Sequence, residues 1–239
     1  MEVARSAGRL LAAAAMACAA LPVIIPAAQS QSCPDIGVVF ARGTAEPPGV
    51  GSVGQRFVDS LRAQVFPRTV GVHGVVYPAS GNFTAGPVFT QNVVDGVRDE
   101  TFHVQGVTSV CPNTRMVLGG YSQGAVVTAL TTSGQIPAGT PPGTAPPPMS
   151  DDVVDNVAAV VLFGKPAGWS VAKYGVPALG VGAAYATKVL ELCAPGDTVC
   201  TAAPVAGPAN GHQAYAVNGM TDQAAAFTVG QLARTPLPV

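Results

Sequence analysis

Short apolar runs alternate with longer amphipathic segments along the chain, and this alternation predicts a β-sheet covered by helices. Ile36–Ala41 is apolar at every position, which is typical of a strand buried on both faces. The segment after it places Val53, Phe57 and Leu61 on one face of a helix. We predict strands at 36–41, 70–77, 115–119, 157–163 and 188–193, and helices at 53–66, 89–107, 123–132 and 214–232. This order predicts a three-layer α/β domain with a central, mostly parallel five-stranded sheet.

Residues 1–30 do not follow this alternation and have the pattern of a secretory signal peptide. Arg5 and Arg9 precede an apolar, alanine-rich stretch from Leu10 to Leu21, and small residues follow, so we predict cleavage after Ala28 or Ser30. The apolar stretch is shorter than the roughly 20 residues that a membrane span requires. We therefore expect the mature protein to be secreted or associated with the cell wall.

Two features of this segment argue against other interpretations. A first core helix is disfavoured because Pro22 and Pro26 interrupt it. Acylation of Cys18, as in a lipoprotein signal, is disfavoured because the three residues before it, Ala15-Met16-Ala17, lack the usual leucine.

Residues 31–239 are predicted to form a single domain. The stretch Pro137–Pro148 is dense in proline, glycine and threonine, which predicts a surface loop that is too short to divide the domain. The whole sequence is 48% hydrophobic and only 10% charged, so it has ample material for a core. Its net charge is −1 and it has no run of basic residues, which argues against a nucleic-acid partner.

Cysteine usage also favours an exported protein. The sequence has five cysteines, and removal of Cys18 with the signal peptide leaves four, which allow three pairings. Sequence spacing favours Cys193–Cys200 around a small loop and leaves Cys33–Cys111 as the second pair. A zinc site is the other common use of four cysteines, but no C-x-x-C pair is present. We predict no metal and no cofactor.

Gly120-Tyr121-Ser122-Gln123-Gly124 has the pattern G-x-S-x-G, which is meaningful where a strand turns sharply into a helix. In so glycine-rich a chain, a chance match is expected about 0.15 times, so the pattern alone is weak. Here a predicted strand precedes it and a predicted helix follows it. Ser122 is therefore the candidate nucleophile.

A serine hydroxyl needs a base, and the base needs an acid that orients it. On α/β-hydrolase folds these residues follow one another as serine, acid and histidine. His212 is the only histidine after Ser122, while His73 and His103 precede it and are interpreted as structural or surface residues. Asp197 follows the fifth predicted strand inside the small disulfide loop, which would fix its carboxylate. An ordinary turn aspartate is the alternative for Asp197.

An acyl-transfer site also needs donors for the oxyanion. One candidate is the backbone N–H of Gln123, directly after the serine and at the start of a helix. The other is Thr44, in the loop after the first predicted strand, where Gly43 permits close backbone approach. The alternative role for Thr44 is to cap the segment that follows.

These segments together resemble the cutinase family, and most closely the secreted cutinase-like esterases of actinobacteria. The resemblance spans the mature chain from Cys33 to the final helix. It is carried by Ala41-Arg-Gly-Thr-Ala-Glu46, Gly120-Tyr-Ser-Gln-Gly124 and Cys193-Ala-Pro-Gly-Asp-Thr-Val-Cys200, with a histidine downstream. Fungal members usually have serine where this chain has Thr44, a change that keeps the hydroxyl. The Pro-rich stretch is the clearest departure from compact members.

The resemblance implies an α/β-hydrolase fold and a serine carboxylester hydrolase that works through an acyl-enzyme at an exposed site without a large lid. It implies Ser122 as nucleophile, Asp197 as acid and His212 as base, together with an oxyanion hole formed by Thr44 and Gln123 and the two disulfides favoured by spacing. Phe83, Val88 and Val205, on loops flanking the site, are the candidate walls for an acyl chain.

The expected partners are an ester or lipid substrate and, transiently, lipid interfaces, and we expect a monomer. An acyltransferase, a phospholipase or a thioesterase would use the same residues, because all of them form the same acyl-enzyme. A non-catalytic secreted protein that binds lipid or a surface is the alternative from another class. Labelling of Ser122 by a fluorophosphonate separates that alternative from the enzymes.

Overall fold

The computed structural model describes residues 32–135, 140–172, 179–202 and 209–234. The chain divides into a unit that ends at Ser32 and a unit that begins at Cys33. The predicted signal peptide belongs to the first unit and lies outside the described residues. Val205 and part of the predicted Pro-rich loop, in the second unit, also lie outside the described residues. Among the helices that are described, none is long and apolar enough to cross a membrane.

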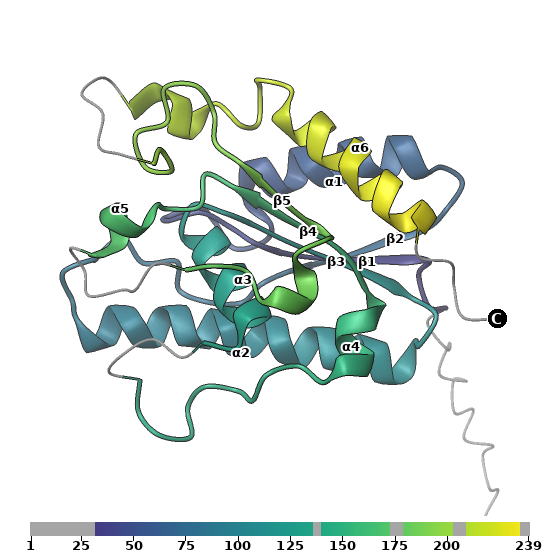
Figure 1. Ribbon diagram of the computed structural model, residues 1–239, viewed down its shortest axis with the longest axis horizontal. Coiled ribbons are helices and arrows are strands. Elements are labelled where there is room, and N and C mark those ends of the chain that lie inside the picture. Colours follow the sequence, from purple (N-terminus) through teal and green to yellow (C-terminus); the bar gives the residue numbers. More distant parts are fainter. Residues whose placement is uncertain (1–31, 136–139, 173–178, 203–208, 235–239) are drawn as a thin grey trace, which may run out of the picture. The chain divides into compact units, whose positions relative to one another are not determined.

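The five strands form one sheet in which every neighbouring pair is parallel (Figure 1). In chain order the strands are β1 (Ile36–Ala41), β2 (Val70–Gly74), β3 (Arg115–Tyr121), β4 (Val157–Phe163) and β5 (Val189–Leu192). Their order across the sheet is β2-β1-β3-β4-β5, so β3 is the central strand. Every residue of β1 and β4 is buried, as their continuous apolar sequences predict.

Helices cover both faces of this sheet. Figure 1 shows α1 and α6 on one face and α2 and α3 on the other. The helices are α1 (Gly51–Val65), α2 (Pro87–Val110), α3 (Gln123–Ser133), α4 (Asp151–Asn156), α5 (Gly168–Ala172) and α6 (Met220–Arg234), with 3₁₀ turns η1 (Ala183–Tyr185) and η2 (Ala209–Gln213). The predicted three-layer α/β fold with a five-stranded parallel sheet is confirmed.

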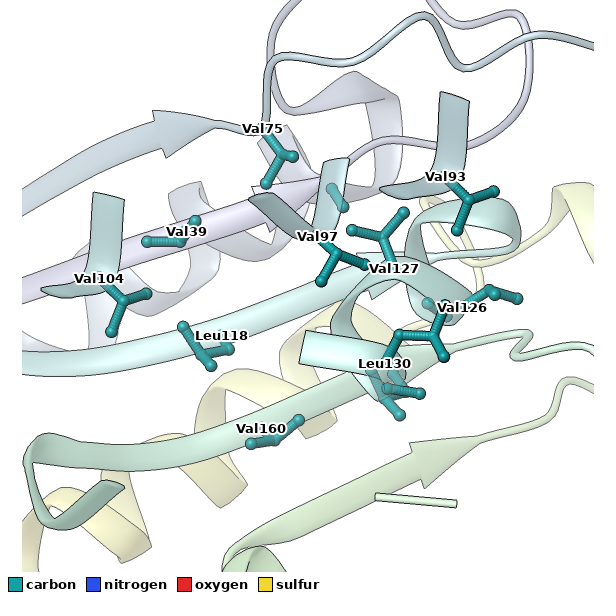
Figure 2. Close-up of a cluster of buried hydrophobic side chains, with 14 of the residues drawn as sticks. Val39, Val75, Val93, Val97, Val104, Leu118, Val126, Val127, Leu130 and Val160 are labelled. Atoms are coloured by element: carbon teal, nitrogen blue, oxygen red, sulfur yellow. The ribbon is translucent and has the colours of Figure 1, made fainter. Parts of the chain in front are cut away.

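Each face of the sheet has its own hydrophobic core, because neighbouring strand residues point to opposite faces. On the α1 and α6 face, the rings of Phe40, Phe57 and Phe163 lie with their centroids 6.1 Å apart in each pair. On the α2 and α3 face, branched aliphatic side chains from strands and helices interlock (Figure 2); they include Val39, Leu118, Val160, Val97, Val104, Val127 and Leu130.

The end of β2 and the start of α6 differ most from their predicted bounds. Strand β2 stops at Gly74 rather than at residue 77, since the carbonyls of Val75 and Tyr77 accept hydrogen bonds from the Arg42 guanidinium. Helix α6 begins at Met220 rather than at residue 214. The residues between form turns that carry side chains back toward the carboxyl ends of the strands, as described below.

Both disulfides favoured by sequence spacing are present. Cys33–Cys111 joins the start of the domain to the residue after α2, across 78 residues of chain. Cys193–Cys200 closes a loop directly after β5, across 7 residues. The second bond constrains the loop that carries Asp197.

Candidate active site

A sharp turn between β3 and α3 holds Ser122. Its backbone angles, φ +54° and ψ −115°, are a conformation that residues with side chains rarely adopt. Both glycines of the motif are required by space, because a Cβ on Gly120 would lie 2.3 Å from the oxygen of Gly124, and a Cβ on Gly124 would lie 2.0 Å from the oxygen of Ala41. The motif therefore lets strand, turn and helix pack without a gap, with the serine at the apex.

His212, on η2, lies within hydrogen-bond distance of both Ser122 and Asp197. Its Nε2 is 2.8 Å from Ser122 Oγ, and its Nδ1 is 2.8 Å from Asp197 Oδ2. An ionised carboxylate can only accept hydrogen bonds, so Nδ1 carries the proton and donates to Asp197. In the neutral ring Nε2 is then the acceptor, and it can take the proton of the Ser122 hydroxyl.

Asp197 is fully buried and held from both sides of its carboxylate. Oδ2 accepts the Tyr215 hydroxyl at 2.6 Å, and Oδ1 accepts the Val199 N–H at 2.8 Å. Burial acts to raise the pKa of Asp197, but the hydrogen bonds from Tyr215, His212 and Val199 outweigh burial and hold the pKa below its usual value. The carboxylate is therefore ionised at neutral pH and can stabilise a positive charge on the imidazole.

Two further glycines make room for this cluster. Gly164 follows β4 and has φ +57°. A Cβ added at this position would lie only 3.0 Å from atoms of Asp197, His212 and Tyr215. A Cβ on Gly211 would lie 2.3 Å from the backbone nitrogen of Asp197. Close approach of three loops thus depends on positions that carry no side chain.

The loop after β1, which carries Thr44, is fixed by Arg42 and Glu46. Arg42 is only 5% exposed and donates through all three of its nitrogens: Nε to the Glu46 oxygen at 2.8 Å, Nη1 to the Val75 oxygen at 3.2 Å, and Nη2 to the Tyr77 oxygen at 2.7 Å. The Glu46 carboxylate accepts the N–H of the residue before Thr44 at 2.6 Å. A loop held by charge-assisted hydrogen bonds can present a preorganised donor.

One cavity is lined by both predicted oxyanion donors, Thr44 and Gln123, and also by Ser122 and His212. Gln123 is the first residue of α3, where the helix dipole favours negative charge. Its side chain donates to the Ser80 oxygen at 3.1 Å, which links α3 to the loop before α2. The structure therefore places both candidate donors on the same side of the serine cluster as the cavity.

The cavity has a volume of about 350 Å³ and is mostly apolar. Of the predicted walls, Phe83 lines the cavity, Val88 is 64% exposed and does not line it, and Val205 lies outside the described residues. The other apolar residues that line it are Phe89, Val93, Val126, Pro166, Val171 and Val199. A concave apolar site beside a candidate nucleophile suits a hydrocarbon chain.

Sequence reasoning missed most of these walls and two tyrosines. Phe89 and Val126 lie on helices, where helical spacing does not distinguish a residue that lines a cavity from one in the core. Tyr121 donates its hydroxyl to the His212 oxygen at 2.5 Å, and Tyr215 bonds to Asp197. The only signals were the place of Tyr121 inside the serine motif and that of Tyr215 three residues after His212.

The two other histidines form a separate pair. The rings of His73 and His103 stack with centroids 3.7 Å apart, and His73 Nε2 lies 2.7 Å from Asp99 Oδ2. Burial, together with the neighbouring His73, lowers the pKa of His103. Neither histidine lines the cavity beside Ser122.

One group of potential metal ligands lies close together among the described residues, namely Cys193, Asp197 and Cys200. Both sulfurs are joined in a disulfide, so they cannot act as thiolate ligands. The donor set does not suit a metal ion.

The sequence of this chain is similar to those of known proteins. The model of the cutinase family matches residues 32–232. Carboxylesterase Culp1 of Mycobacterium tuberculosis is 44% identical over 208 residues, which cover 86% of this chain and 85% of that protein. Phospholipase Culp4 of the same organism is 42% identical over 226 residues, which cover 93% and 90%.

A solved structure shows the same architecture. The cutinase of Trichoderma reesei, in complex with a phosphonate inhibitor, superposes with a TM-score of 0.61 at 34% identity, covering 84% of this chain and 77% of that one.

Proposed function

The chain belongs to the cutinase family, and we propose that this serine carboxylic ester hydrolase cleaves acyl esters through a covalent acyl-enzyme on Ser122. The observation that carries the proposal is the continuous path Ser122 Oγ, His212 and Asp197, with 2.8 Å at both contacts. Each contact is within the range that proton transfer requires.

In the first half of the reaction, Ser122 Oγ attacks the carbonyl carbon of the ester while its proton passes to His212 Nε2. The carbonyl oxygen becomes an oxyanion that accepts hydrogen bonds from the backbone of Gln123 and from Thr44. Asp197 stabilises the imidazolium that forms. The bond to the leaving alcohol then breaks as His212 returns the proton to the alcohol oxygen, and the acyl group remains on Ser122.

In the second half, a water molecule gives a proton to His212 and attacks the acyl-enzyme. The acid leaves and the hydroxyl of Ser122 is restored. An alcohol in place of water would give acyl transfer by the same steps, so the competition between them is decided at the acyl-enzyme. We propose hydrolysis as the main outcome, because the related Mycobacterium proteins are a carboxylesterase and a phospholipase.

The acyl chain of the substrate is proposed to occupy the apolar cavity. Its volume of about 350 Å³ corresponds to roughly a dozen waters at about 30 Å³ each. A hydrocarbon chain of middle length therefore fits, and a longer chain extends toward the surface. Phe83 and Phe89, whose ring centroids lie 5.3 Å apart, form one wall.

We propose that the enzyme acts outside the cytoplasm. The signal-like residues 1–30 and the two disulfides support export to an oxidising compartment. The apolar cavity beside Ser122 also supports the proposal that the enzyme meets its substrate at lipid interfaces, and we propose that it does so as a monomer.

The proposal is tested by replacing Ser122→Ala. Hydrolysis of p-nitrophenyl esters should fall by about four orders of magnitude or more, and labelling by a fluorophosphonate should disappear, while the thermal unfolding transition is kept. Ser133→Ala is the matched control, because this serine ends the same helix and its hydroxyl bonds within its own turn, to the Leu130 oxygen at 3.3 Å and from the Gln135 N–H at 3.2 Å. Ester hydrolysis by purified Ser122→Ala at the wild-type rate would refute the proposal.

A panel of substrates then defines the reaction more closely. p-Nitrophenyl esters of increasing acyl length, a triglyceride, a phospholipid, a thioester and a cutin-type polyester all present an acyl carbon to the same serine. Release of fatty acid from the phospholipid at a rate equal to that from simple esters would favour the phospholipase alternative.

A further inference from the structure

Tyr215 is a buried tyrosine whose hydroxyl reaches into the cluster around Asp197. It lies in the turns between η2 and α6 and is 0% exposed. Its ring packs against Tyr121, with centroids 5.7 Å apart, and against Phe163, at 5.9 Å. Its oxygen lies 2.6 Å from Asp197 Oδ2, a short distance that is typical of a hydrogen bond to an ionised group.

The partners of this oxygen decide where its proton points. The Ala194 N–H donates to it at 3.0 Å, which occupies one lone pair. The sulfur of Cys200 lies 3.5 Å away but belongs to a disulfide, so it has no proton to give and accepts only weakly. The single hydroxyl proton therefore goes to Asp197.

The acceptor atom is the same one that His212 uses. Asp197 Oδ2 accepts the Tyr215 hydroxyl at 2.6 Å and the His212 Nδ1–H at 2.8 Å. The two donors share one oxygen, so each affects how strongly the other is held. Removing the hydroxyl would leave His212 facing a carboxylate with one stabilising contact fewer in a buried site.

We propose that Tyr215 is a positioning residue for the ester hydrolase reaction, which sets the direction and the charge of the Asp197 carboxylate. Tyr215 acts through Asp197 and touches neither substrate nor the reacting atoms. The inference rests on the proposed roles of Ser122, His212 and Asp197. The Tyr215 hydroxyl keeps Asp197 Oδ2 directed at the imidazole of His212. It also limits how strongly the carboxylate holds the proton of the imidazolium, which must be returned to the leaving group.

The effect of the hydroxyl can be separated from that of the ring. Tyr215→Phe keeps the packing against Tyr121 and Phe163 and removes only the donor. We expect kcat to fall by about ten- to hundredfold, as for the loss of one hydrogen bond to a charged group, with KM within about twofold. We also expect the acid limb of the kcat/KM profile to move to higher pH, because the Asp197–His212 pair takes up a proton more readily.

Tyr185→Phe is the matched control. Tyr185 is also buried, at 2% exposed, and among the described residues its hydroxyl oxygen has no hydrogen-bond partner. It does not line the cavity. This variant should keep the wild-type kcat and the wild-type pH profile.

A double-mutant cycle tests whether Tyr215 acts through Asp197. In the background of Asp197→Asn, which removes the charge, Tyr215→Phe should lower kcat by less than about threefold. An equal loss in both backgrounds would overturn the proposal in favour of a purely structural role. A wild-type kcat and an unshifted acid limb in Tyr215→Phe would also overturn it.

Two measurements keep the test decisive. If Tyr215→Phe does not fold, difluorotyrosine can be incorporated at position 215, which keeps the hydroxyl and makes it a stronger donor. The acid limb of the kcat/KM profile should then move to lower pH. An unchanged acid limb would refute the proposal. Ser122→Ala reports on the proposed function by itself. An inactive Ser122→Ala together with an unaffected Tyr215→Phe would leave the function standing and reject only the role of Tyr215.

Discussion

Glu100 is a buried carboxyl group between α2 and α3, and replacing it with glutamine should stabilise the protein at alkaline pH. Its side chain is 0% exposed. Its oxygens lie 3.1 and 3.2 Å from the Thr128 hydroxyl and 3.1 Å from the Thr131 hydroxyl. Burial raises the pKa of Glu100 to about 8, although both hydroxyls act in the opposite direction.

The other contacts of the two hydroxyls are compatible with a neutral carboxyl group. Thr128 Oγ1 also lies 3.0 Å from the Gly119 oxygen, and Thr131 Oγ1 lies 3.0 Å from the Val127 oxygen. Each hydroxyl has one proton, and a carbonyl can only accept. When both hydroxyls donate to these carbonyls, neither has a proton left for Glu100, and a neutral Glu100 can donate its single proton to one of them.

The sign of the pH effect follows from the two pKa values. In the unfolded chain the carboxyl group ionises near its ordinary pKa of 4.5, and in the fold it ionises near 8. Between these values unfolding releases a proton, so stability falls as pH rises from about 4.5 to about 8 and is then constant. At about 1.4 kcal/mol for each unit between the two values, the loss reaches at most about 5 kcal/mol.

The assay is denaturant unfolding of the wild type and of Glu100→Gln across the range from about pH 5 to about pH 9, with the disulfides intact. At the acid end the two proteins should differ by less than about 1 kcal/mol, because glutamine replaces a neutral acid of the same shape. At the alkaline end the variant should be more stable by several kcal/mol, or on the order of 10 °C in Tm. Asp59→Asn, at an exposed side chain that bonds to Gln55 on the same helix, controls for net charge.

A difference between wild type and Glu100→Gln that is the same at both ends of the pH range would refute this reasoning. So would a variant that is less stable than the wild type at about pH 9. Either result would mean that Glu100 is ionised in the fold and stabilised by the two threonines.

Two further predictions concern the cavity and the disulfide beside Asp197. Val126→Trp should fill part of the cavity and lower the ratio of kcat/KM for long over short acyl esters by at least about tenfold, as measured with p-nitrophenyl esters; an unchanged ratio would place the acyl chain elsewhere. Replacing both Cys193 and Cys200 with alanine should lower stability by about 2–3 kcal/mol, from the entropy of a small loop. It should also lower kcat by releasing Asp197, and wild-type kcat in a folded variant would contradict that role.

Much of the fold could be predicted because a continuous apolar run indicates a strand that is buried on both faces of a parallel sheet. The runs at β1 and β4 are apolar throughout, and these strands keep their predicted bounds. The end of β2 and the start of α6 could not be predicted in this way. The end of β2 is set by Arg42, because its guanidinium donates hydrogen bonds to the carbonyls of Val75 and Tyr77. The start of α6 is set by the turns that follow His212.

The candidate site shows the same division. Motif spacing and chain order were enough to nominate Ser122, Asp197 and His212, and the structure brings the three side chains together. The walls of the cavity were not accessible, because Phe89 obeys the same helical spacing as a core residue. Tyr215 was missed because its hydrogen bond arises from the path of a turn, for which the sequence has no periodic signal.

The contact between Gly124 and the end of β1 has a consequence for how this enzyme can be altered. At Gly124, the turn that holds Ser122 touches the backbone of Ala41 and Arg42 directly, with no side chain between them. The distance between the turn that holds Ser122 and the loop that carries Thr44 is therefore set by main-chain atoms. The walls of the cavity come from side chains on other segments, such as Phe83, Phe89 and Val171. Substrate range can be redesigned, or can drift in evolution, by exchanging these walls while the reacting centre stays unchanged.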